Sequence, residues 1–322
     1  MLSQLLSSAA FLTGALVAVS PAAAAVPGKL QARDDRKPIW SIAHKVLRTD
    51  GLSEAIYDGA NAVEVDLTAW REGEGAETSQ WWMDHDGDGK NYGDTADTLL
   101  RAVGDTAGDD ISFVVFDIKT PDECAVDEAG CGMETLVNMA RDYVLANGIG
   151  VVYGFTNPGD AAGDAFKYVI ENLDDDTAVR ITGQTDPVLE AFNTHGAEIP
   201  PEKRIIDYGN PYLGGEKGDP QFGKCESVSG TEVCPNLVRA IEARENGEIG
   251  TVMLWTVGSS DADGERTAQA LDAGIDAVVY GYAFGEYEDS ARTIEAKGHV
   301  ISWLPGPDGG ARNAGQADRP WN

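Results

Sequence analysis

Short apolar runs rich in valine and isoleucine recur along the chain from residue 39 onward, and segments with helical spacing separate most of them. Most runs are continuously apolar rather than alternating, which is typical of parallel strands that are covered on both faces. The strands expected from this pattern are residues 39–43, 62–67, 111–118, 151–155, 178–181, 204–207, 251–256 and 277–280. The helices expected between them are residues 51–57, 95–103, 133–146, 161–172, 187–193, 236–245 and 266–273.

This order of elements predicts a single (β/α)8 barrel over residues 37–322, with a C-terminal tail that packs on it. Eight strands spread over roughly 280 residues suit a fold that typically takes about 250 residues. A doubly wound open sheet is the alternative. No glycine-rich dinucleotide or phosphate loop follows any of the expected strands, which disfavours the usual ligands of that fold.

The first 25 residues have an apolar centre followed by small residues with an A-x-A pattern, which predicts a secretory signal peptide. A membrane anchor is the alternative, but the apolar run is shorter than the ~20 residues of a membrane span, and Pro21 interrupts it. Residues 26–36 are expected to be a flexible stretch. We therefore expect a secreted protein.

The chain of 322 residues carries 54 acidic and 24 basic side chains, a formal net charge of −30. No run of lysine or arginine interrupts this acidity, so binding to nucleic acid or to a strongly anionic membrane is disfavoured. The composition fits a soluble secreted protein that meets cationic or zwitterionic ligands. No interface pattern stands out, and a monomer is expected.

Export makes disulfides possible, and four cysteines allow three pairings. Their spacing suggests two local loops, Cys124–Cys131 and Cys225–Cys234, while free buried thiols remain the alternative. Neither pair has a C-x-x-C spacing or a histidine nearby, so a zinc site is disfavoured.

Carboxylates occur inside otherwise apolar strands. Glu64 and Asp66 are two residues apart and share one face of a strand, and Asp117 and Lys119 repeat this spacing at the end of another. Burying these acids is costly unless a positive charge neutralises them. A hard divalent cation, Mg²⁺ or Ca²⁺, would do so through oxygen ligands. The alternative is that Lys119 and arginine residues pair with the acids for structural reasons.

The chain has four histidines, and two of them lie where a barrel places its active site. His44 ends the first expected strand and His85 lies in a loop rich in glycine and aspartate. Beside a carboxylate cluster, two histidines can take a proton from one oxygen and give a proton to another. His195 and His299 have no such neighbours and are expected to be bystanders.

The loop Asp84-His85-Asp86-Gly87-Asp88-Gly89 begins like a calcium-binding loop. Its twelfth position is Thr95, whereas a calcium loop of this kind requires a bidentate glutamate there. We interpret the loop as a solvated acidic turn, with weak Ca²⁺ binding as the alternative. The DADG at residues 261–264 is a weaker match still.

Several segments are similar to one enzyme family. The sequence RKPIWSIAH (36–44) resembles the opening of the sphingomyelinase D/phospholipase D enzymes of spider venoms and their bacterial and fungal relatives. GANAVEVD (59–66) resembles their metal-binding segment, and FDIKT (116–120) resembles the segment with their third metal ligand and catalytic lysine. LWTV (254–257), ALDAGIDA (270–277) and ADRPW (317–321) also match, in the same order along the chain. The resemblance extends to the glycerophosphodiester phosphodiesterases, which are similar barrels.

The resemblance implies that Glu64, Asp66 and Asp117 bind one Mg²⁺ against the phosphodiester oxygens, and that Lys119 adds a second positive contact.

It also implies that His44 and His85 are the acid–base pair. Trp255 would bound the cleft or contact a quaternary ammonium by cation–π attraction, with packing inside the barrel as the alternative.

By the same resemblance, the enzyme cleaves the choline headgroup of sphingomyelin and lysophosphatidylcholine, and attack by the lipid's own hydroxyl gives a cyclic phosphate. Contact with a zwitterionic membrane or micelle surface would use exposed residues such as Trp81 and Trp82. Two alternatives stay open. One is a glycerophosphodiester phosphodiesterase acting on soluble headgroup diesters. The other is a non-catalytic, secreted calcium-binding protein that uses the loop at Asp84.

Overall fold

The computed structural model describes residues 35–71, 78–87, 92–106, 108, 110–211, 213, 221–282, 284–305 and 310–321. The expected signal peptide, and the stretch that follows it up to residue 34, lie outside the described residues. Residues Arg36–Asn322 belong to one compact unit. In the described part of the chain, no helix has both the length and the apolar character needed to cross a membrane.

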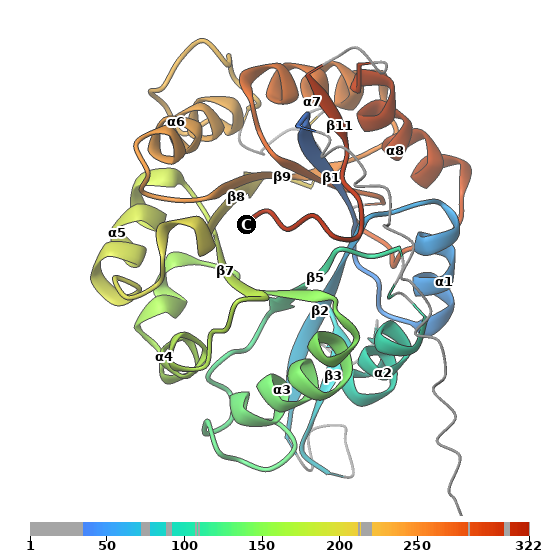
Figure 1. Ribbon diagram of the computed structural model, residues 1–322, viewed down its shortest axis with the longest axis vertical. Helices are drawn as coiled ribbons and strands as arrows, with labels where there is room; N and C mark the ends of the chain where they lie inside the picture. The colour runs from blue at the N-terminus through green and yellow to red at the C-terminus, as the bar shows by residue number, and fades with distance from the viewer. Residues whose placement is uncertain are drawn as a thin grey trace, which may run out of the picture. The chain divides into compact units, whose positions relative to one another are not determined.

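Eight parallel strands close into a barrel (Figure 1). Each strand pairs with the next along the chain, and the last pairs with the first, so no edge is left open. The predicted (β/α)8 barrel is confirmed, and the open doubly wound sheet is wrong. The barrel strands are β1 (Lys37–Ala43), β2 (Ala62–Trp70), β5 (Phe113–Ile118), β6 (Gly150–Phe155), β7 (Thr177–Thr182), β8 (Arg204–Gly209), β9 (Thr251–Val257) and β10 (Ala277–Tyr280).

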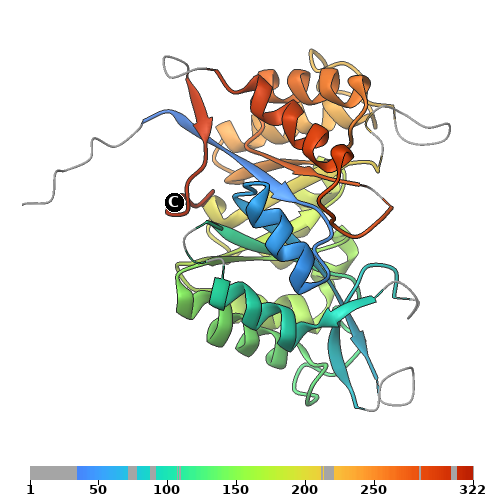
Figure 2. The same cartoon turned by 90° about the vertical axis from the view of Figure 1, so that its right-hand side faces the viewer.

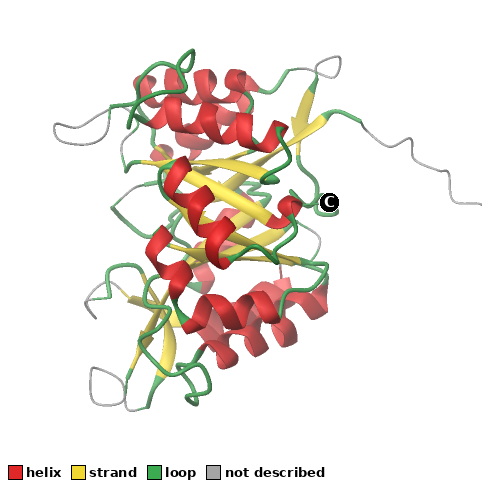
Figure 3. Cartoon of the chain, turned by 90° about the vertical axis from the view of Figure 1, so that its left-hand side faces the viewer, coloured by secondary structure: helices red, strands yellow, loops and turns green. Residues whose placement is uncertain are grey.

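Helices form a ring outside the barrel (Figures 1 and 3). Helix α3 continues through a π-helical turn (Ala140–Val144) and a 3-10 turn (Leu145–Asn147). Further 3-10 turns are Pro158–Ala162 and Pro201–Lys203. The α-helices are α1 (Thr49–Tyr57), α2 (Ala96–Thr106), α3 (Met133–Met139), α4 (Asp164–Glu171), α5 (Thr185–His195), α6 (Val233–Glu245), α7 (Asp261–Ala273) and α8 (Ala291–Trp303).

Differences from the sequence prediction lie mostly at the ends of elements and in the added strands. Helix α7 starts five residues earlier than its apolar pattern indicates, because Ser260 caps it by accepting a hydrogen bond from the Asp263 backbone N–H. The DADG segment is therefore the first turn of a helix rather than a cation loop. Helix α8 and the strands β3 (Gln80–Asp84), β4 (Tyr92–Thr95) and β11 (Ala311–Asn313) were not predicted.

Strands β3 and β4 extend the sheet beyond the barrel on the side of β2. β2 runs past the predicted end at Leu67 as far as Trp70, because its last residues pair antiparallel with β3. β4 then pairs antiparallel with β3. This extension matters for the site, because His85 directly follows β3.

The C-terminal tail packs on the barrel, as predicted, and it closes the end where the strands begin (Figure 2). β11 pairs with the start of β1. The Trp321 ring is buried and lies 5.8 Å from the Phe113 ring, which also contacts Trp40. With this end filled, the opposite end of the strands is where a ligand can enter.

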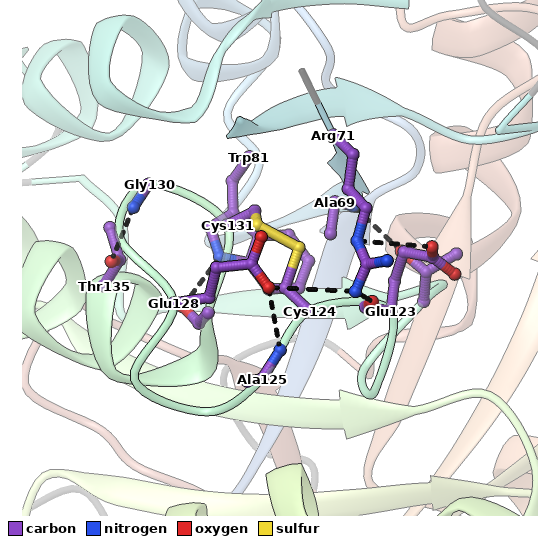
Figure 4. The surroundings of a disulfide bond; sticks show 12 residues. Ala69, Arg71, Trp81, Glu123, Cys124, Ala125, Glu128, Gly130, Cys131 and Thr135 are labelled. Atoms are coloured by element: carbon purple, nitrogen blue, oxygen red, sulfur yellow. Dashed lines mark hydrogen bonds and ion pairs between the residues drawn. A yellow bond between two sulfur atoms is a disulfide. The ribbon is translucent and has the colours of Figure 1, made fainter. Parts of the chain in front are cut away.

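Both predicted disulfides are formed. Cys124 and Cys131 close a loop after β5, and Cys225 and Cys234 close a loop at the start of α6. Around the first bridge, Arg71 contacts Glu128 across the loop (Figure 4). The bridges fasten two of the loops that connect strands to helices.

Candidate active site

Five of the predicted site residues come from three neighbouring strands and meet at the open end of the barrel. His44 directly follows β1, Glu64 and Asp66 belong to β2, and Asp117 belongs to β5, with Lys119 just beyond its end. The parallel register places Asp66 beside Asp117. The alternation of strand side chains puts Glu64, Asp66 and Asp117 on the same, inward face.

These residues line a cavity of about 440 Å³. The predicted residues in its lining are His44, Glu64, His85, Asp117, Lys119 and Trp255. Asp66 lies at 0% exposure and contacts Lys119. The cavity is therefore enclosed by acids and cations on one side and by the Trp255 ring on another.

The two histidines lie together, with ring centroids 6.3 Å apart and planes almost perpendicular. Nδ1 of His44 donates to the backbone carbonyl of Tyr282 at 3.3 Å, because a carbonyl can only accept. Nε2 of neutral His44 is then the basic nitrogen, and it lies 3.8 Å from Oε2 of Glu64. Nδ1 of His85 lies 2.6 Å from Oδ1 of Asp86.

Burial lowers the pKa of His44 to about 4, although the neighbouring Asp66 acts to raise it. The imidazole is therefore neutral at physiological pH. A neutral ring whose Nε2 carries no proton can accept one, which suits the role of general base.

Two cations pair with the predicted metal ligands. Nζ of Lys119 lies 2.8 Å from Oδ1 of Asp66 and also contacts Asp117. Arg180, from β7, places Nη1 2.8 Å from Oε1 of Glu64 and Nη2 2.5 Å from Oδ1 of Asp117. Each of the three acids therefore has a basic partner, the arrangement that the sequence analysis left open as the alternative to a metal.

The acids differ in their affinity for protons. Burial raises the pKa of Glu64 to about 8, although Arg180 acts to lower it. Burial also acts to raise the pKa of Asp117, but Lys119 and Arg180 outweigh it and hold that pKa below its ordinary range. Asp117 is therefore firmly ionised, whereas Glu64 holds its proton more readily.

Sequence reasoning missed Arg180 and Asp207. Nη1 of Arg180 also lies 3.1 Å from Oδ2 of Asp207, which belongs to β8. Both side chains are buried and line the same cavity. The signal was present, because each is a charged residue inside a largely apolar strand, the feature that identified Glu64 and Asp117.

The donor set suits a hard divalent cation. All three predicted ligands offer carboxylate oxygens, and Oδ2 of Asp66 is buried without a hydrogen-bond partner among the described residues. In the described part of the chain, a group of three donor atoms within 4.8 Å of one another occurs at Cys124, Glu128 and Cys131, where a disulfide joins the sulfurs (Figure 4). The three barrel acids are not gathered so tightly, and Lys119 and Arg180 contact them.

The loop after β3 is a turn held by its first aspartate. Oδ1 of Asp84 accepts hydrogen bonds from the backbone N–H groups of Asp86 and Gly87, and Oδ2 accepts one from Nε1 of Trp70. Both oxygens are occupied, which favours the structural interpretation of this loop. Asp88 and Gly89 lie outside the described residues.

Two expectations about tryptophans have different outcomes. Trp255 lines the cavity and also packs against the inner core of the barrel, and its contact with a quaternary ammonium stays a prediction. The expectation that Trp81 is exposed is wrong, because its side chain is buried at 1% exposure and its Nε1 donates to the backbone carbonyl of Gly132. Trp82 stacks on Trp70 with ring centroids 4.8 Å apart.

The other two histidines lie on helices outside the barrel, His195 at the end of α5 and His299 in α8. Neither lines the cavity.

The fold and the cavity define a (β/α)8 enzyme whose strand ends combine an imidazole pair with acids that suit a hard cation. Comparison with known proteins identifies the family. A sequence model of sphingomyelinase D/phospholipase D matches residues 34–321, and the chain belongs to this family. It is accordingly an enzyme of the phospholipase D type, which cleaves phosphodiesters.

Relatives cover most of the chain. The sphingomyelinase D of Aspergillus flavus is 34% identical over 89% of this chain and 91% of its own length. That of Ajellomyces capsulatus is 33% identical over 89% of each chain. That of Uncinocarpus reesii is 36% identical over 84% of this chain and 74% of its own. Among solved structures, a glycerophosphoryl diester phosphodiesterase from Parabacteroides distasonis superposes with a TM-score of 0.47 at 13% identity, over 87% of this chain and 92% of that one.

Proposed function

We propose that this protein is a secreted, Mg²⁺-dependent sphingomyelinase D-type enzyme that removes choline from sphingomyelin and lysophosphatidylcholine and leaves a cyclic phosphate. The observation that carries the proposal is the meeting of His44 and His85, 6.3 Å apart, beside three buried acids and Lys119 in one cavity. The sphingomyelinase D relatives support the choice of lipid.

Glu64, Asp66 and Asp117 would bind the Mg²⁺, which when bound neutralises charge on the phosphodiester oxygens. Lys119 lies against two of these acids and adds a positive charge at the same end of the cavity. Together these groups favour the extra negative charge that a phosphodiester develops on attack.

In the proposed reaction, Nε2 of His44 takes the proton of the attacking hydroxyl, whose oxygen forms a bond to phosphorus. The bond between phosphorus and the choline oxygen breaks, and His85 gives that oxygen a proton. His44 suits the first role because its pKa is about 4 and it is neutral. His85 suits the second because it lies at the outer side of the pair, 31% exposed, and is held by Asp86.

When the attacking hydroxyl belongs to the lipid itself, the product is a cyclic phosphate. When it belongs to water, the product is a phosphomonoester. The Trp255 ring would bound the headgroup end of the cavity, where its face can attract the quaternary ammonium of choline.

Secretion is part of the proposal. The N-terminal sequence is typical of a signal peptide, and both disulfides suit an oxidising compartment. Expression of the full chain with analysis of the culture medium tests this, since an intracellular, reduced protein would contradict it.

A substrate panel tests the activity. Sphingomyelin, lysophosphatidylcholine and glycerophosphocholine are offered in parallel, with Mg²⁺ or with EDTA, and the products are identified by ³¹P NMR. We expect cyclic phosphates from the two lipids and loss of turnover with EDTA. Turnover of glycerophosphocholine alone would favour a glycerophosphodiester phosphodiesterase. Turnover of none, with Ca²⁺ binding that survives His44→Ala and Asp117→Ala, would favour the non-catalytic alternative.

A further inference from the structure

Arg180 is an arginine enclosed inside a barrel, with only 1% of its surface exposed. A guanidinium removed from water costs several kcal/mol unless carboxylates surround it with good geometry. Here three carboxylates do so, those of Glu64, Asp117 and Asp207. Two of the three, Glu64 and Asp117, are the proposed metal ligands. The same acids that would bind the metal therefore also offset the burial of this guanidinium.

The two terminal nitrogens of Arg180 form a fork that contacts acids on two different strands. Nη1 reaches Oε1 of Glu64 on β2, and Nη2 reaches Oδ1 of Asp117 on β5. The guanidinium is planar, so the distance between its two terminal nitrogens is fixed. The side chain therefore sets the spacing between oxygens on two different strands, which a lysine with a single ammonium cannot reproduce.

Asp207 holds the fork in place. Its Oδ2 lies 3.1 Å from Nη1 of Arg180, and it comes from β8, the strand beside β7. Arg180 is thereby anchored to the strand next to its own while it reaches acids on β5 and β2, beyond β6 on its other side. Each acid uses only part of its lone-pair capacity on Arg180, and a carboxylate offers about four lone-pair positions.

We propose that Arg180, anchored by Asp207, is a positioning residue that orients Glu64 and Asp117 for binding the divalent cation. This inference rests on the proposed function, which assigns those acids as metal ligands. Residues that hydrogen-bond to metal ligands typically change metal affinity about 10- to 100-fold when mutated. The competing explanation is that Arg180 is only a counter-charge, which would repel the cation and whose removal would tighten binding.

Calorimetric titration of the full chain with Mg²⁺, without substrate, separates these explanations. We expect Arg180→Lys, which keeps the charge and loses the fork, to weaken Mg²⁺ binding about 10- to 100-fold. Asp207→Asn leaves Arg180 in place without its anchor and should weaken binding about 10-fold. Circular dichroism and thermal unfolding check that each variant is folded, and Asp207→Asn decides the question if Arg180→Lys does not fold.

Arg204 offers a matched control. It is also a buried arginine, on β8, but its guanidinium donates to the backbone carbonyls of Ile199 and Ala197. Arg204→Lys should leave the Mg²⁺ affinity unchanged. Kinetics give a second readout, because activity lost in Arg180→Lys should return toward the wild-type kcat when Mg²⁺ is raised. A residue that contacts the substrate would not be rescued in this way.

The outcomes are distinct. If the wild-type protein binds no Mg²⁺, the metal assignment in the proposed function fails, and this inference fails with it. If the wild type binds Mg²⁺ and both site variants bind it equally well or more tightly, the inference alone is overturned, and Arg180 is a structural counter-charge.

Discussion

Replacement of Glu64 by glutamine should make the protein more stable at alkaline pH while removing its cation binding. The reason is the cost of ionising this side chain inside the barrel, where it is 4% exposed. Burial raises its pKa from 4.5 to about 8 in the folded protein. Glutamine has nearly the shape of protonated glutamic acid and never ionises, so the variant does not carry this cost.

The magnitude follows from linkage between proton binding and folding. One pKa unit corresponds to about 1.4 kcal/mol, so a rise from 4.5 to about 8 corresponds to about 5 kcal/mol. Because the folded-state pKa is the higher one, this contribution to stability is fully present below pH 4.5 and is lost as the pH rises through about 8. Part of the gain in the variant is offset, since Arg180 loses one ionised partner but keeps Asp117 and Asp207. We expect a net gain of about 2 kcal/mol at about pH 9.

The assay is urea unfolding of the wild type and Glu64→Gln in EDTA, at about pH 5 and about pH 9. The difference in unfolding free energy should be small at the lower pH and should favour the variant at the higher one. Glu190→Gln, at an exposed position of α5, is the control and should show no such growth. A difference that does not change with pH, or a variant less stable than the wild type at about pH 9, would refute the reasoning.

Three further predictions concern catalysis, the headgroup and stability. His44→Ala should lower kcat at least about 100-fold, because the general base is removed. In a pH–rate profile, the wild-type rate should rise as the pH passes through about 4, where His44 loses its proton. Trp255→Ala should raise KM for micellar lysophosphatidylcholine about 5- to 30-fold, with Trp255→Phe in between, and an equal KM in all three proteins would exclude contact with the headgroup. Replacing Cys124 and Cys131 by serine should lower the free energy of unfolding in urea by about 2 to 3 kcal/mol, because the bridge closes a short loop; an unchanged urea midpoint would count against this.

Much of the fold follows from local sequence pattern. The apolar runs identified all eight barrel strands, because strands covered on both faces need continuous apolar sequence. The acids inside those runs pointed to the site for a similar reason, since a charge in an apolar strand requires a compensating partner. Cysteine spacing gave both disulfides, because each bridge closes a loop of neighbouring residues.

Tertiary structure decided which partner each acid has. Arg180 is 116 residues from Glu64 and 63 from Asp117 along the chain, and no local pattern relates residues so far apart. The order of strands in the sheet brings them together, because only β6 separates β7 from β5, and β2 pairs with the other side of β5. In the same way, pairing of β3 with β2 buries Trp81 and carries His85 to within 6.3 Å of His44. Sequence periodicity determines which side chains point inward, whereas the closed register of the strands determines which of them touch.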